Sequence, residues 1–272
     1  MAKRQPHIKA AFQRRCIFCG SPKVSGEHLW PEWMHPYLPK QPNAMKREIY
    51  NHIKLGKVLS LAQKKPQQGH TYTKKVRAVC KPCNEIWMSR IEEEAKPILI
   101  PLLRGLPLLL DREKRSKLAV WLALKVMVGE SHDPRDAVTM QEDRTAFMLS
   151  RTIPPYMKIW IGSHDSEDWY MSYWHQTARI NLTPDPPAGG NFKNIQSTAL
   201  GIGHILSLTI AATVPHCEID LTTDQPILPL WPLQREDIEW PLQELSSESA
   251  DRLATTLGWW LAESNPSWVP LS

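Results

Sequence analysis

Hydrophobic residues recur at helical spacing in the segment that follows Asn84. They lie mostly three or four positions apart: Ile86, Trp87, Ile91, Ala95 and Ile98. This spacing places apolar side chains on one face of an α-helix, so it predicts a helix that begins near Asn84. Pro97 and Pro101 are expected to limit this helix, because a proline inside a helix removes a backbone hydrogen bond.

Two further helices are predicted beyond this point. Residues 113–130 are mostly apolar and predict one long, largely buried helix, whereas residues 248–263 predict a closing helix that starts after a pair of serines. Runs rich in β-branched and aromatic residues predict strands between these two helices, at 158–162, 169–174, 178–182, 205–213 and 217–221. In the first third, a short strand is predicted within 24–34, and a hairpin with a long basic loop within 40–77.

The chain is therefore expected to be an α+β protein. Its 272 residues are enough for two domains. We place the boundary near residue 97, so that residues 1–97 form the first domain. Residues 98–272 are expected to form a mixed α/β domain, whose fold the pattern does not specify.

Charge is distributed unevenly between these two parts. Residues 1–90 hold 18 Lys and Arg against 4 Asp and Glu, a net charge of +14, whereas residues 91–272 carry −9. Such asymmetry suggests a nucleic-acid-binding part joined to another part, although a merely solvated basic surface is the simpler alternative. The expected contacts to nucleic acid are five basic residues: Arg14, Arg15, Lys74, Lys75 and Arg77.

No apolar run reaches the roughly 18 residues of a membrane span, and the basic N-terminus lacks the apolar stretch of a signal peptide. A cytoplasmic location without a membrane partner is expected. In a reducing compartment, cysteines spaced as Cys-x-x-Cys are typical of metal ligands rather than disulfides.

Four of the five cysteines have that spacing: Cys16 with Cys19, and Cys80 with Cys83. Four thiolates suit a tetrahedral Zn²⁺ ion, and such a closed site is structural because it leaves no coordination position for chemistry. The fifth, Cys217, is expected to be a small buried hydrophobe rather than a reactive thiol.

Three polar residues accompany the two cysteine pairs: Glu27, His28 and Asn84. A zinc ion would bring the helix that starts at Asn84 close to the Glu27-His28 dipeptide despite their separation in sequence. Carboxylate and amide oxygens suit Mg²⁺ or Mn²⁺, and a neutral histidine beside such an ion can accept a proton from water. The alternatives are a structural role for His28 and a helix-capping role for Asn84, since asparagine is a preferred cap.

This arrangement resembles the HNH endonucleases, the ββα-metal nucleases. The residues that carry the resemblance are Cys16-Ile-Phe-Cys19, Ser25-Gly-Glu27-His28-Leu-Trp-Pro31 and Cys80-Lys-Pro-Cys83-Asn84. The resemblance covers about residues 12–96. It implies that His28 is the general base, that Glu27 and Asn84 hold a catalytic Mg²⁺ or Mn²⁺ ion, and that the four cysteines hold a structural Zn²⁺ ion.

The chain departs from that family in two places. The family's middle asparagine has no counterpart before the second cysteine pair, where Thr71, Thr73 and Lys75 stand and His70 is the nearest polar candidate. One helical turn after Asn84, where some members have His or Lys, this chain has Trp87 and Met88.

Three functions are therefore weighed. The first is a metal-dependent endonuclease that hydrolyses DNA; the sequence leaves open whether it also cuts RNA. The second is a degenerate HNH module that binds nucleic acid without cutting it. The third is an effector controlled through the acidic part 98–272, which would bind a protein partner. The sequence does not indicate an oligomeric state.

A small apolar core is expected under the zinc module, formed by Trp30, Trp33, Trp87 and Met88.

Overall fold

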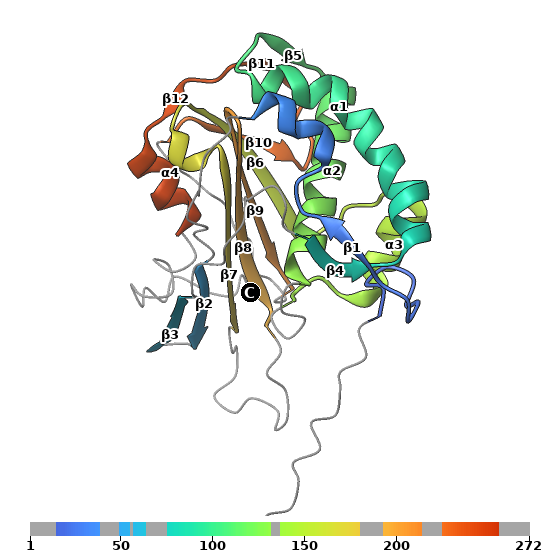
Figure 1. Ribbon diagram of the computed structural model, residues 1–272. Helices are drawn as coiled ribbons and strands as arrows, with labels where there is room; N and C mark the ends of the chain where they lie inside the picture. Colours follow the sequence, from blue (N-terminus) through green and yellow to red (C-terminus); the bar gives the residue numbers. More distant parts are fainter. Residues whose placement is uncertain are drawn as a thin grey trace, which may run out of the picture.

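The computed structural model describes residues 15–38, 49–54, 57–63, 75–131, 137–179, 193–213 and 225–255. They form a mixed α/β protein in which helices cover both faces of a large sheet (Figure 1). No helix within these ranges is long and apolar enough to cross a membrane.

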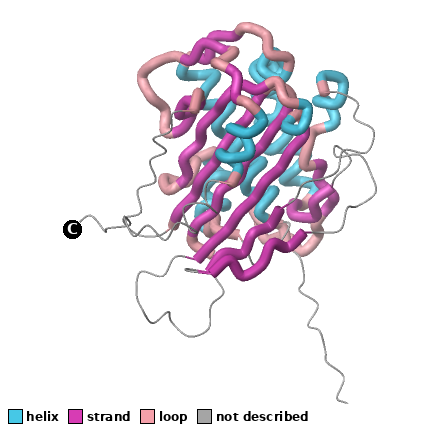
Figure 2. The backbone as a smooth tube through the Cα atoms, turned by 90° about the vertical axis from the view of Figure 1, so that its left-hand side faces the viewer, coloured by secondary structure: helices cyan, strands magenta, loops and turns pink. Residues whose placement is uncertain are grey.

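The large sheet is mostly antiparallel, and its strands run side by side across the molecule (Figure 2). In spatial order its strands are β10 (Ile227–Trp231), β6 (Met157–His164), β9 (Ile205–Ala212), β8 (Ile195–Ile202), β7 (Met171–Arg179), β2 (Ile49–Lys54) and β3 (Lys57–Gln63). β2 joins β7 in parallel, and β12 (Glu244–Leu245) adds to β6 in parallel. A hairpin from the N-terminal third thus extends a sheet built from the rest of the chain.

Both faces of the sheet are covered, and its central strands direct apolar side chains toward each face. Every residue of β8 and β9 is buried. On one face, Leu200 and Ile202 share a core with α1 (Ser89–Leu103) and α2 (Arg112–Glu130). On the other face, Leu206 and Leu208 share a second core with α4 (Ser247–Ala254).

Several predicted elements are confirmed. α2 matches the predicted helix 113–130; it begins at Arg112, after Asp111, whose carboxylate accepts a hydrogen bond from the Lys114 N–H. The predicted strand 158–162 lies in β6, and 205–213 coincides with β9 except for its last residue. The predicted strand 169–174 only overlaps β7, which begins at Met171, and the predicted strand 178–182 starts at the end of β7 and continues outside the described residues. The predicted strand 217–221 lies outside the described residues, as does the end of the helix predicted over 248–263.

The sequence pattern did not predict several elements. These include α3 (Gln141–Ser150), β8, β10, β12 and the short pair formed by β5 (Leu108–Leu110) and β11 (Ile238–Trp240). A short 3-10 helix, η5 (Glu167–Trp169), precedes β7. All of them depend on packing partners that are distant in sequence.

The predicted end of the first long helix was wrong. α1 contains both Pro97 and Pro101 and ends only at Leu103. Ile98, Leu99 and Leu102 are buried on its inner face, and this burial offsets the backbone hydrogen bonds that the prolines remove.

The boundary predicted near residue 97 falls inside this continuous helix. A single hydrophobic core also runs through both parts of the chain: it contains Phe18 and Trp30 as well as Leu122 and Ile159. Experiments on this protein should therefore use the full chain, since a cut at residue 97 would divide a helix and a core.

Candidate functional site

The two cysteine pairs lie at the same end of a two-stranded antiparallel sheet. It consists of β1 (Ser25–His28) and β4 (Lys75–Val79), and Ser25 pairs with Val79. Cys16 and Cys19 precede the start of β1, and Cys80 and Cys83 follow the end of β4. Because antiparallel strands place the start of one beside the end of the other, both cysteine pairs meet there.

Local hydrogen bonds shape the first cysteine pair. The Gly20 N–H donates to the Cys16 carbonyl over 2.9 Å, and the Cys16 N–H donates to the Ser21 carbonyl over 2.8 Å. Gly20 has a φ of +73°, a conformation that glycine adopts without a steric penalty. The Ile17 N–H also donates to the Ala78 carbonyl over 2.9 Å, which ties this turn to β4.

The four thiols are arranged as a zinc site requires. Their Sγ atoms all lie within 4.8 Å of one another, with 3.8 Å between Cys16 and Cys83 and 3.5 Å between Cys19 and Cys80. Four sulfurs at 2.3 Å from a tetrahedral Zn²⁺ ion would be about 3.8 Å apart. The prediction that these cysteines come together is confirmed, and the cluster could hold a zinc ion.

The surroundings of the four thiols differ. Burial raises the pKa of Cys83 and of Cys80. Burial acts in the same direction on Cys16, but hydrogen bonds from the backbone of Cys19 and Cys80 outweigh it and lower the pKa of Cys16 to about 7. Since zinc binds thiolates, metal binding should release protons from the buried thiols.

The residues predicted to form a small apolar core under the zinc module are packed as expected, but they join the one large core that also contains α1, α2 and the sheet. Trp30 and Met88 are fully buried, and Trp33 and Trp87 pack against the same core. The Trp87 ring also meets Phe18 edge to face, with 4.8 Å between the ring centroids.

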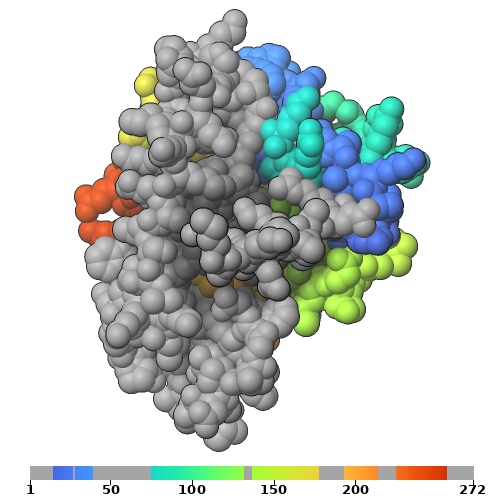
Figure 3. Space-filling view, turned by 60° about the horizontal axis from the view of Figure 1, so that its bottom comes forward, coloured from blue at the N-terminus to red at the C-terminus, as the bar shows by residue number. Residues whose placement is uncertain are grey.

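Helix α3, from the second half of the chain, supports the first cysteine pair. Its Phe147 packs against Phe18 and Trp87, and the Gln141 side-chain amide donates to the Ile17 carbonyl over 2.9 Å. In space-filling view, the N-terminal segment (blue), β4 with the helix after it (teal) and the start of the second half (yellow-green) lie side by side (Figure 3).

Asn84 lies next to the cysteine cluster, inside the first turn of a helix. The π-helix η3 (Cys83–Met88) runs directly into α1, and the Asn84 N–H donates to the Cys80 carbonyl over 3.1 Å. The helix-capping alternative for Asn84 was wrong, because the position before η3 is Pro82 and the Asn84 N–H is already bonded within the turn.

His28 lies at the opposite end of β1 from the cysteines. It pairs with Lys75, which is four residues before Val79 and therefore about 13 Å along the strand from the zinc end. Its imidazole is largely buried, and its Nδ1 lies 3.2 Å from Oε1 of Glu32. Burial lowers the pKa of His28, and the positive charge of Lys75 lowers it further, whereas Glu32 acts in the opposite direction.

The side chain of Lys75 lies over β1 at the point where the pairing register of β1 with β4 shifts. The register between β1 and β4 shifts between Ser25 and Glu27, and a Cβ atom at Gly26 would lie 3.3 Å from Cδ of Lys75. The aliphatic stem of Lys75 thus crosses β1 at the residue that has no side chain. Lys75 and Arg77 are both exposed on the same face of β4, since their side chains alternate with the buried Val76.

The remaining predicted residues are placed as follows. Glu27 belongs to β1 and pairs with Val76, and Arg15 is exposed, donating from its guanidinium to the Gly20 carbonyl over 3.2 Å. Six residues singled out in the sequence lie outside the described residues: Arg14, His70, Thr71, Thr73, Lys74 and Cys217.

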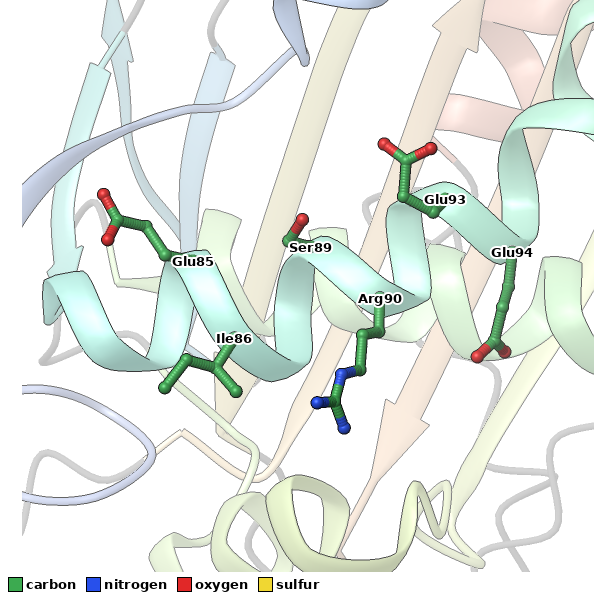
Figure 4. A pocket seen from close by; sticks show the side chains of 6 residues that line it. All are labelled: Glu85, Ile86, Ser89, Arg90, Glu93 and Glu94. Atoms are coloured by element: carbon green, nitrogen blue, oxygen red, sulfur yellow. The ribbon is translucent and has the colours of Figure 1, made fainter.

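A groove of about 480 Å³ follows the outer face of η3 and α1 (Figure 4). Ile86, Arg90 and Glu94 point to one side of the helix, and Glu85, Ser89 and Glu93 point to the other. With three glutamates and one arginine, this groove repels phosphate.

Two groups near the site were missed by the sequence analysis. One is Glu32, because its contact with His28 depends on the turn between β1 and the 3-10 helix η1 (Glu32–Tyr37). The other is the pair Lys125–Glu92, in which the fully buried ammonium of α2 lies 2.6 Å from the carboxylate of α1. An acidic residue four positions after a strand-end histidine could have drawn attention to Glu32.

Comparison with known proteins gives no further guidance. No family model, no curated protein sequence and no solved structure matches this chain.

Proposed function

We propose that this chain is a metal-dependent endonuclease of the HNH type, which hydrolyses phosphodiester bonds in DNA. The observation that carries the proposal is the arrangement of β1, β4 and the helix after them. A four-cysteine cluster stands at one end of the strand pair, and His28 stands at the other end beside an exposed lysine. The family resemblance of the same residues supports this interpretation.

In this proposal His28 is the general base. Its lone pair takes a proton from water, the water oxygen bonds to phosphorus, the bond from phosphorus to the sugar oxygen breaks, and that oxygen takes a proton from solvent. Glu27, next to His28 in β1, would supply one hard oxygen ligand to a Mg²⁺ or Mn²⁺ ion; the second ligand expected from the sequence, Asn84, lies at the cysteine end of the strand pair, away from His28. When bound, such an ion stabilises the negative charge that develops on the phosphate.

The nucleic acid would lie along the exposed face of β4. Lys75 and Arg77 are two residues apart there, and Arg15 belongs to the neighbouring turn. These three basic residues would contact phosphates and would not read bases, so they should give cleavage little preference for particular DNA sequences.

The proposal is tested by cleavage. The full chain with Mg²⁺ or Mn²⁺ should nick plasmid DNA, and His28→Ala should cut about 100- to 10,000-fold more slowly, the usual contribution of a general base. The matched control is His204→Ala, since His204 lies in the turn between β8 and β9, and it should cut as the wild type does. Equal cutting by His28→Ala, or no cutting of DNA or RNA by the wild type with either metal, would overturn the proposal. Binding without cutting would instead favour the degenerate module.

A second prediction assigns different roles to the two exposed basic residues of β4. Lys75 lies beside His28, so Lys75→Ala should lower kcat by about 10- to 100-fold, since a hydrogen bond to a charged group is worth roughly 1.5–3 kcal/mol. Arg77→Ala should weaken binding, and lower its salt dependence, without a change in kcat. Single-turnover cleavage at saturating protein measures the first effect, and binding at several salt concentrations measures the second. Equal kcat values for the two variants would contradict a special role for Lys75.

A further inference from the structure

The contact between His28 and Glu32 is built into the fold. His28 ends β1, and Glu32 begins η1 four residues later. The turn between them is anchored by Leu29 and Trp30, which are only 2% and 1% exposed. It is closed by a hydrogen bond of 3.0 Å from the Met34 N–H to the carbonyl of Pro31, so the backbone at both ends of the contact is fixed.

The geometry of this contact selects one form of the imidazole. A neutral imidazole carries its single proton on either Nδ1 or Nε2. Nδ1 of His28 lies 3.2 Å from the Glu32 carboxylate, which only accepts hydrogen bonds. The carboxylate therefore favours a proton on Nδ1, and this leaves the lone pair on Nε2.

We propose that Glu32 is the positioning residue of the general base. It accepts a hydrogen bond from Nδ1–H of His28, fixes the orientation of the ring and leaves Nε2 ready to take a proton from water. This rests on the proposed function, because it takes His28 as the base. It adds an interaction that the family resemblance did not supply, since Glu32 lies outside the residues that carry it.

The exposed fractions of the two side chains indicate that the contact serves to position His28 rather than to stabilise the fold. The His28 side chain is 17% exposed and that of Glu32 is 75% exposed. An ion pair with one partner so exposed contributes little to stability. Removing the Glu32 carboxylate should therefore change the imidazole and the cleavage rate, while the melting temperature stays nearly constant.

The experiment compares Glu32→Ala with the wild type in the full chain. Nitrogen NMR of ¹⁵N-histidine-labelled protein, with the His28 signals assigned from His28→Gln, shows which ring nitrogen carries the proton. The wild type should have the proton on Nδ1, and Glu32→Ala should move it mainly to Nε2. Cleavage should fall by about 10- to 100-fold in kcat, as is typical when the partner of a working histidine is lost, with little change in KM.

Glu85→Ala is the matched control, because Glu85 is also an exposed glutamate with a partner four residues away, 3.5 Å from Lys81. It should change neither the tautomer nor kcat. A wild-type His28 protonated on Nε2, or an unchanged tautomer in Glu32→Ala, would overturn the proposed contact. A changed tautomer with an unchanged kcat would overturn the positioning role. A wild type that cuts nothing would instead overturn the nuclease function, whereas the NMR result on the contact would stand by itself.

Discussion

Replacing Cys83 with serine should release zinc and unfold the module around the cysteine cluster. Cys83 is buried at the start of η3 beside the other three thiols, so serine in its place removes one of the four thiolate ligands. A structural zinc ion contributes on the order of 10 kcal/mol to folding, which is comparable to the whole stability of an ordinary protein. Elemental analysis should find one zinc per wild-type chain and less in the variant, and thermal unfolding should show a large loss of stability.

The control for this variant is Cys217→Ser, since Cys217 belongs to neither Cys-x-x-Cys pair. It should retain one zinc ion per chain, as the wild type does. A chelator strong enough to remove zinc should reproduce the effect of Cys83→Ser in the wild type. Wild-type protein that is fully folded and contains no zinc would contradict the assignment of the cluster as a structural metal site.

The cysteine cluster could be predicted from the sequence because the signal is local. Each pair is spaced to bind one metal ion, and the identity of the ligands already restricts which ion fits. No knowledge of the fold is needed to recognise Cys16 with Cys19, or Cys80 with Cys83. The 60 or so residues between the pairs do not weaken the prediction, because the pairing of β1 with β4 brings them together.

The extent of α1 could not be predicted in the same way. The local rule that proline ends a helix is correct for an isolated segment. At Pro97 and Pro101 it is overridden because the residues around them, such as Leu99 and Leu102, are completely buried against the rest of the protein. Tertiary packing of this kind is invisible to a window of sequence.

The order of strands in the large sheet and the partner of His28 were unpredictable for a related reason. β2 lies beside β7, although β2 ends at Lys54 and β7 begins only at Met171. Glu32 meets His28 only because buried Leu29 and Trp30 turn the chain between them. The sequence therefore predicted that the four cysteines would come together, but it did not predict what surrounds His28.

A buried ionic network between α2, α3 and the sheet illustrates the same point. Glu130, the last residue of α2, is fully buried and accepts hydrogen bonds from three partners. Arg144 donates over 3.0 Å, the Gln196 amide over 2.5 Å, and Thr139 donates both from its backbone, over 3.1 Å, and from its hydroxyl, over 2.5 Å. Nothing in the local pattern around Glu130 indicated that it would be buried, because its partners come from α3, from β8 and from the segment before α3.

Replacing Glu130 with alanine should destabilise the protein by about 3–5 kcal/mol, because the buried Arg144 guanidinium would lose its counter-charge. The melting temperature should fall by roughly 10 °C, measured by calorimetry on zinc-loaded protein. Glu113→Ala is the matched control on the same helix: Glu113 pairs with Lys117 in solvent, so the change should cost less than about 1 kcal/mol. If both variants melted together, the network would be incidental to stability. A selective loss in Glu130→Ala, with the zinc content unchanged, would show that α2, α3 and the sheet are held together independently of the metal.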